Sequence, residues 1–183
     1  MHDNQHNLFE TPIWGFKFAH HDLQTIDYTN HILELYENEV SASKSNIGGW
    51  QSRDNIHEDG IFQEFNKDLL LVSSDILKDY TTSKPYIMNM WANVNKKHAY
   101  NGHHTHQGEL SGVFYCSAIK EHGQLIFVDP RIRSFQSVIR SNSFAVKPER
   151  LALIIFPSWL EHYVRPNITD IDRISISFNI GIK

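Results

Sequence analysis

Two histidines one residue apart, His104 and His106, precede an apolar stretch at residues 110–116, and a third, His162, follows the apolar stretch at 151–156. Neutral imidazole is a ligand for iron, copper, nickel and zinc. Side chains at positions i and i+2 of a strand lie on one face. We therefore predict that His104 and His106 point to one place, where a distant strand supplies His162 as the third ligand of a single metal ion.

A possible anion-binding pair follows this set. Arg173 and Ser175 stand at the start of an alternating stretch, eleven and thirteen positions after His162, so both side chains are expected on one strand face. A guanidinium binds a carboxylate through two parallel hydrogen bonds, and a neighbouring hydroxyl adds another. A surface salt bridge is the other interpretation of Arg173. Its place in an otherwise apolar strand favours a buried cation that needs a ligand carboxylate.

The second half of the chain has the pattern of short strands separated by turn residues. The predicted strands are residues 86–94, 110–116, 124–128, 143–146, 151–156 and 173–182. In the last of these, Ile174, Ile176 and Phe178 alternate with polar residues, which is typical of a strand with one apolar face.

The first half is predicted to be mostly helical. Helical spacing of apolar residues covers residues 22–43 and 61–80, the first with Ile26, Ile32 and Val40 on its apolar face, after an extended segment at 8–18. Paired glycines at 48 and 49 indicate an irregular turn. We predict an α+β, mainly β fold with one domain, residues 1–183, in which a helical buttress (1–84) supports a β-sandwich or barrel (85–183).

Composition limits the possible partners and compartment. The 183 residues carry a net charge of −4, so no overall positive field attracts nucleic acid or an anionic membrane. No apolar run approaches the ~20 residues that span a bilayer, and residues 1–6 do not resemble a signal peptide. The single cysteine, Cys116, lies in an apolar run and is expected to be a buried thiol. A reducing cytoplasm is the expected location.

The chain resembles the iron(II)- and 2-oxoglutarate-dependent oxygenases, specifically a family of short members found in phages and bacteria. The matching segments are residues 8–12, 48–52, 91–94, 104–106, 110–115, 127–131, 156–162 and 173–179. They occur in the same order and cover nearly the whole chain, so the set is much more specific than any single segment.

This resemblance implies a double-stranded β-helix, or jelly roll, with a metal ion in the barrel mouth. It implies His104 as the first ligand, His162 as the distal ligand, and Arg173 as the anchor for the far carboxylate of 2-oxoglutarate. Further hydrogen bonds to this co-substrate are implied for Ser175, Asn93 and Tyr115. The implied activity is that of a dioxygenase that uses Fe(II), 2-oxoglutarate and O2, hydroxylates an unidentified substrate, and releases succinate and CO2.

His106 departs from the wider superfamily, in which an aspartate or glutamate holds this position beside two histidines. Three outcomes are open: a three-histidine site, a site completed by Glu109 or Asp129, or a centre with altered chemistry. We expect three histidines. Because each must be neutral to bind, metal binding is expected to weaken below about pH 6.

Two other classes of protein fit part of the same residues. A cupin-type metalloenzyme, or a non-catalytic metal-binding barrel, would use His104, His106, Glu109 and His162 without 2-oxoglutarate and would not need the Arg173–Ser175 pair. An interaction module would use its tryptophans only as core. Substrate contacts are expected from segments 48–52, 95–102 and 131–142, which we place near the barrel mouth.

Overall fold

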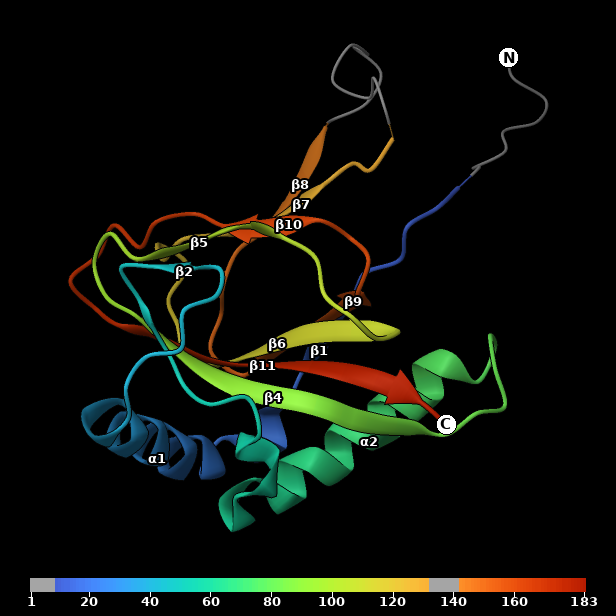
Figure 1. The fold of residues 1–183 in the computed structure, drawn as a ribbon, viewed down its shortest axis with the longest axis horizontal. Helices are drawn as coiled ribbons and strands as arrows, with labels where there is room; N and C mark the ends of the chain where they lie inside the picture. Colours follow the sequence, from blue (N-terminus) through green and yellow to red (C-terminus); the bar gives the residue numbers. More distant parts are fainter. Residues whose placement is uncertain (1–8, 132–141) are drawn as a thin grey trace.

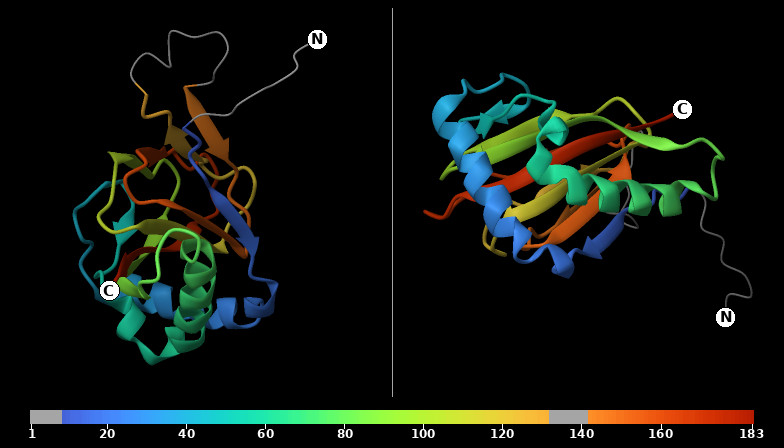
Figure 2. Two further views of the ribbon diagram at one scale, coloured as in Figure 1. Left: turned by 90° about the vertical axis from the view of Figure 1, so that its right-hand side faces the viewer. Right: turned by 90° about the horizontal axis from the view of Figure 1, so that it is seen from below.

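Two antiparallel sheets face each other, and two helices cover the outer face of the larger sheet (Figures 1 and 2). The structure is a computed structural model that describes residues 9–131 and 142–183. Residues 131–142, which were expected to contact the substrate, therefore lie almost wholly outside the described residues. Within the described ranges, no helix combines the length and apolar character needed to cross a membrane.

The larger sheet has the strand order β1-β9-β6-β11-β4-β3. Its strands are β1 (Trp14–Lys17), β9 (Ala152–Pro157), β6 (Leu110–Ser117), β11 (Arg173–Ile182), β4 (Pro85–Asn95) and β3 (Trp50–Gln51). The long strand β11 is central and pairs with β4 on one side and β6 on the other. Strand β11 therefore joins two strands, β4 and β6, that come earlier in the sequence.

The smaller sheet has the order β2-β5-β10-β7-β8. Its strands are β2 (Asn46–Ile47), β5 (Tyr100–His104), β10 (His162–Val164), β7 (Leu125–Val128) and β8 (Ser143–Val146). Strand β10 lies between β5 and β7, and its pairing with β5 sets His162 directly opposite His104. Two of the predicted ligands, far apart in sequence, are therefore neighbours across one ladder.

Alternation along β11 divides the molecule into an apolar and a polar layer. Ile174, Ile176 and Phe178 belong to the large core between the sheet and the helices. Arg173 and Ser175 face the other way and line a cavity between the two sheets. The predicted alternation is confirmed, and it places the polar face of the strand toward the candidate site.

Helices α1 (Gln24–Asn38) and α2 (Gln63–Leu77) both lie under the larger sheet (Figures 1 and 2). Their buried faces supply Tyr28 and Ile32 from α1 and Phe65 and Leu69 from α2. Both helices were predicted, but they are shorter than expected. Short 3-10 turns, η2 (Ile56–Glu58) and η3 (Gly60–Phe62), precede α2.

Two residues assigned to the buried face of the first helix are exposed. Val40 is 95% exposed because α1 ends at Asn38 and Glu39 already has an extended backbone (φ −113°, ψ 141°). Ile26 is 55% exposed on the first turn of the helix. Apolar spacing alone did not mark where packing against the sheet begins and ends.

Five strands were not predicted as strands: β1, β2, β3, β5 and β10. Four of them, β1, β2, β3 and β10, have only two to four residues each. The fifth, β5, has the sequence YNGHH, which lacks apolar alternation. These strands form because neighbouring strands provide hydrogen-bonding partners, a tertiary effect that local patterns do not report. β1, β2 and β3 also show that residues before position 85 contribute to both sheets.

Phe65 provides a test of the core between helices and sheet. Its ring is fully buried and lies 5.1 Å, centroid to centroid, from Phe114 of β6. We predict that Phe65→Ala lowers the free energy of unfolding by about 3–5 kcal/mol, because it removes a large buried ring and leaves a cavity. Urea denaturation measures this change. Leu71→Ala is the matched control: Leu71 is on the same helix but 60% exposed, so a change of no more than about 0.5 kcal/mol is expected.

Candidate metal centre

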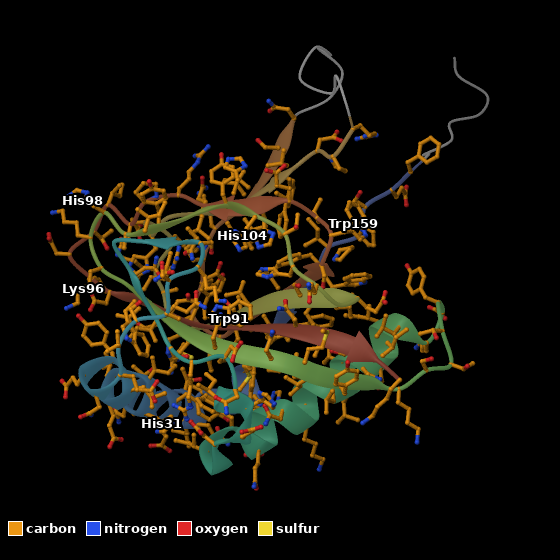
Figure 3. The ribbon with its side chains drawn as sticks, viewed as in Figure 1. His31, Trp91, Lys96, His98, His104 and Trp159 are labelled. Atoms are coloured by element: carbon orange, nitrogen blue, oxygen red, sulfur yellow. The ribbon has the colours of Figure 1, made fainter. Side chains whose placement is uncertain are left out.

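Three histidine rings converge between the sheets. Ring centroids are 4.3 Å apart for His104 and His162, 4.8 Å for His104 and His106, and 5.1 Å for His106 and His162. One nitrogen of each ring lies within 4.8 Å of the others, a separation that one metal ion can bridge. His104 is labelled in Figure 3, on the strand that faces Trp91 of the larger sheet. The predicted convergence of the three residues is therefore present.

The reason for this convergence differs from the one expected. His104 is the last residue of β5, and His106 lies beyond the strand, in the loop before β6. The interpretation of both histidines on one strand face is therefore wrong. The loop is held instead by a backbone hydrogen bond of 2.9 Å from the His106 amide to the carbonyl of Ser158. The His106 ring also packs 5.5 Å from the Trp91 ring.

Backbone carbonyls fix the orientation of two of the rings. Nδ1 of His104 lies 2.7 Å from the oxygen of Gly102, and Nδ1 of His162 lies 2.8 Å from the oxygen of Leu160. A carbonyl oxygen only accepts, so Nδ1 carries the proton in both rings. The lone pair is then on Nε2, and such a second hydrogen bond is usual for metal-binding histidine.

Burial keeps these rings neutral. It lowers the pKa of His162 to about 3, with the nearby His104 and His106 rings adding to the effect and the Leu160 carbonyl opposing it. Burial likewise lowers the pKa of His106 to about 4, and it lowers that of His104 against the effect of its carbonyl partner. Metal binding was expected to weaken below about pH 6, on the basis of an ordinary imidazole pKa. The lowered pKa values shift this weakening to lower pH. At neutral pH all three rings are in the form that binds metal.

Neither carboxylate considered from the sequence joins the three histidines. The side chain of Asp129 accepts a hydrogen bond of 2.8 Å from Nε of Arg131, and Glu109 is exposed. Among the described residues, the group of converging ligand atoms at this place comprises His104, His106 and His162 alone. The geometry favours the three-histidine alternative over a site completed by Glu109 or Asp129.

Arg173 lies in the same cavity as the three histidines and is 3% exposed. Its Nη1 donates a hydrogen bond of 2.9 Å to the carbonyl of Gly123, while Nε has no partner among the described residues. No salt bridge to it is formed within residues 9–131 and 142–183. Burial lowers the pKa of Arg173, and the Tyr115 hydroxyl opposes this shift. The surface salt-bridge interpretation is therefore excluded for this part of the chain.

The other residues expected to contact the co-substrate line the same cavity: Asn93, Tyr115 and Ser175. Asn93 donates to the Ser177 hydroxyl at 3.1 Å, and its side-chain oxygen is buried without a partner in the described structure. Burial raises the pKa of Tyr115, so its phenol keeps its proton. The cavity therefore combines a cation with hydroxyl and amide groups that can bind a polar ligand.

A second cavity of about 460 Å³ adjoins the first, and His104, His106 and Trp91 line both. From the sequence, Trp91 was expected only as a core residue, and no role was expected for the carbonyls of Gly102 and Leu160, which orient two of the histidine rings. Trp91 lies within one of the segments that match the family. No local sequence pattern indicates which backbone carbonyl accepts a hydrogen bond from a histidine ring. Gln51, from the segment expected near the mouth, lines this outer cavity.

Comparisons with known proteins agree with this geometry. Residues 89–179 match a family described as "Putative 2OG-Fe(II) oxygenase". The match covers 91 of the 183 residues, and the resemblance to the oxygenases expected from the sequence is confirmed. A comparison with curated proteins found no match.

Solved structures share the fold at low sequence identity. HygX from Streptomyces hygroscopicus, with nickel and 2-oxoglutarate bound, is 12% identical over 93% of this chain and 83% of its own, with a TM-score of 0.71. A prolyl-4-hydroxylase from Pseudomonas putida is 14% identical over 94% of each chain, with a TM-score of 0.69. SnoN, an epimerase from nogalamycin biosynthesis, is 12% identical over 93% of this chain and 76% of its own, with a TM-score of 0.73. The predicted double-stranded β-helix is confirmed.

The lowered histidine pKa values predict an acid-sensitive fold. In the unfolded chain a histidine has a pKa of ~6.5, so below this pH the unfolded state binds more protons than the metal-free folded state. Through His106 and His162, stability is therefore expected to fall as pH drops from ~6.5 and to level off only near pH 3–4. Urea denaturation across this range measures the effect. In His162→Gln, the free energy of unfolding should fall less steeply with decreasing pH, by ~1.4 kcal/mol per pH unit. If the variant and the unchanged protein gave parallel curves, the low pKa of His162 would be contradicted.

Proposed function

We propose that this protein is an Fe(II)- and 2-oxoglutarate-dependent dioxygenase that hydroxylates a substrate and forms succinate and CO2. In this proposal His104, His106 and His162 hold the iron, and Arg173 binds the far carboxylate of 2-oxoglutarate. The observation that carries it is a buried guanidinium without a carboxylate partner in the described structure, in the same cavity as three converging neutral imidazoles.

The residues present fit both groups. Imidazole nitrogen is a suitable ligand for Fe(II), and the ring orientations leave Nε2 free on His104 and His162. A buried arginine is stable only when its charge is compensated, and Nε of Arg173 still has a hydrogen bond to donate. A carboxylate matches that need in charge and in the geometry of its oxygen atoms.

With 2-oxoglutarate and O2, bound Fe(II) supplies the oxidising power that cleaves a substrate C–H bond. The chain's own residues bind and orient. Arg173 would fix one end of the co-substrate, with Ser175, Tyr115 and Asn93 near it on the same cavity wall. The apolar side chains Leu125, Phe156 and Val164 in that wall limit the entry of water. The outer cavity, bordered by His104 and His106, is the place we propose for the substrate.

A cupin-type enzyme that does not use 2-oxoglutarate explains fewer of these features. Its fourth ligand would be Glu109, which is exposed and outside the cluster of ligand atoms. It would also leave the buried Arg173 without a function. Titration of the manganese-loaded protein with 2-oxoglutarate separates the two classes, since only the oxygenase is expected to bind it.

Arg173 tests the anchor role. We predict that Arg173→Lys weakens 2-oxoglutarate binding by about 10–100-fold, because the lysine keeps the charge but loses the fork of two parallel donors. Arg173→Ala should weaken it further. Calorimetric titration of the manganese-loaded variants measures the affinity. Manganese binding itself should be unchanged in Arg173→Lys; an unchanged affinity for 2-oxoglutarate would exclude the anchor role.

The three histidines are tested by uncoupled turnover. Purified protein with Fe(II), ascorbate and 2-oxoglutarate is expected to form succinate slowly even without a substrate. His162→Ala should reduce this rate by at least about 100-fold, since even a residue that only orients a ligand changes metal affinity by 10–100-fold. His98→Asn is the matched control, because His98 is exposed and asparagine tolerates its backbone φ of 70°. Succinate formation that persists in His162→Ala would contradict the proposed iron site.

A further inference from the structure

A second cluster of residues that can bind a metal ion lies on the face of the larger sheet that packs against the helices. It comprises His20 and His21, in the 3-10 turn η1 (Ala19–His21) that follows β1, and Asp68 in α2. The His21 ring packs against Phe18 and Phe65, with centroid distances of 5.5 and 5.8 Å. These phenylalanines belong to the core between sheet and helices, so the cluster is separate from the histidines of the candidate iron site.

Its ligand atoms converge on one carboxylate oxygen. Nε2 of His20 lies 2.8 Å and Nε2 of His21 lies 3.0 Å from Oδ2 of Asp68. All three atoms lie within 4.8 Å of one another. The His21 side chain is fully buried and that of His20 is 58% exposed. The cluster therefore has a rigid inner side and an open outer side through which an ion can enter.

The surroundings of His21 resemble those of a metal ligand. Nδ1 of His21 lies 3.1 Å from the hydroxyl of Tyr28, and histidines that bind metals usually have such a partner on the other ring nitrogen. Burial raises the pKa of Tyr28, so this partner is the neutral phenol. The ring of His21 can then bind a metal ion through Nε2, while Nδ1–H donates a hydrogen bond to the Tyr28 oxygen.

A second carboxylate lies close to the cluster. Glu64 precedes Asp68 by one turn of α2, so the two side chains share a face of the helix. Its charge acts on His21 and on Tyr28. The amide of Gln24 lies 3.4 Å from Oε2 of Glu64, and the other end of that amide, Oε1, is buried with no partner in the described structure. Glu64 thus adds a second carboxylate beside the two imidazoles and Asp68, and the Gln24 amide contacts it.

We propose that His20, His21 and Asp68 form a second metal site, which binds a divalent transition-metal ion of the zinc class. Two imidazoles and one carboxylate are a common ligand set for zinc, with the remaining position open to water or to Glu64. The site ties the turn after β1 to helix α2. Such a cross-link would stabilise the fold, and the site does not depend on the function proposed for the other three histidines.

The same atoms also satisfy one another without a metal. The Tyr28 hydroxyl can donate to Nδ1 of His21, and Nε2–H of both histidines can donate to Asp68. This hydrogen-bonded network is the competing explanation. It predicts no binding of zinc at this place.

Zinc stoichiometry distinguishes the two explanations. Equilibrium dialysis of the metal-free protein against micromolar zinc, followed by elemental analysis, should give two ions per chain. His162→Ala removes the site between the sheets and should leave one ion. His20→Ala should also leave one, since it removes a ligand but keeps the buried contacts of His21, and the double variant should bind none. His98→Asn is the control for loss of an exposed histidine and should retain two.

Asp68→Asn provides an independent variant of similar shape. In the His162→Ala background it should weaken zinc binding at least about tenfold, the size of effect seen when even a supporting residue is lost. Zinc should also raise the melting temperature of His162→Ala but not that of His162→Ala/His20→Ala. The proposal is overturned if His162→Ala binds no zinc, or if its remaining ion is unaffected by His20→Ala.

Discussion

A guanidinium buried between two sheets, without a carboxylate partner among the described residues, is the constraint around which the site is organised. Arg173 contacts one carbonyl, that of Gly123, and this compensates only part of the cost of removing a full charge from water. The polar groups that line the cavity beside it are hydroxyl, amide and imidazole groups rather than acids. An anionic ligand would complete the charge balance that the described part of the chain leaves open.

The fold can tolerate this polar interior because its main hydrophobic core lies elsewhere. The outer face of the larger sheet packs against α1 and α2, where Phe65, Phe114 and Phe178 are fully buried. This arrangement frees the inner face of the same strands from most of the task of stabilising the fold. A smaller apolar cluster, which includes Phe127 and Phe156, packs around His162 and holds the distal side of the site.

Much of this arrangement could be predicted from sequence, for reasons that individual residues make clear. In β11 the alternation of Ile174 and Ile176 with Ser175 predicts both the strand and its two faces, because the face buried in the core carries apolar residues and the other face carries polar ones. Strand β5 has no such alternation, because its residues are mostly polar and it forms by pairing with neighbouring strands. The meeting of His104 with His162 depends on that ladder, and the position of His106 depends on a bond from its own backbone to Ser158. The residue types of the candidate ligands and their order along the chain could therefore be predicted from the sequence. The positions of the three histidine rings relative to one another depend on tertiary structure.

The three-histidine set has an electrostatic consequence. An aspartate at position 106 would offset one charge of a divalent ion, whereas neutral imidazole offsets none. With iron bound, the cavity would hold the full charge of the metal together with that of Arg173, and its described lining contains no acidic residue. A ligand with two carboxylates is matched to such a site, because one can face the metal and the other the guanidinium. Replacing the carboxylate of the wider superfamily by His106 should therefore make binding of the doubly charged co-substrate more favourable, since its two negative charges meet three positive charges, on Fe(II) and Arg173, that no acidic residue of the described lining offsets.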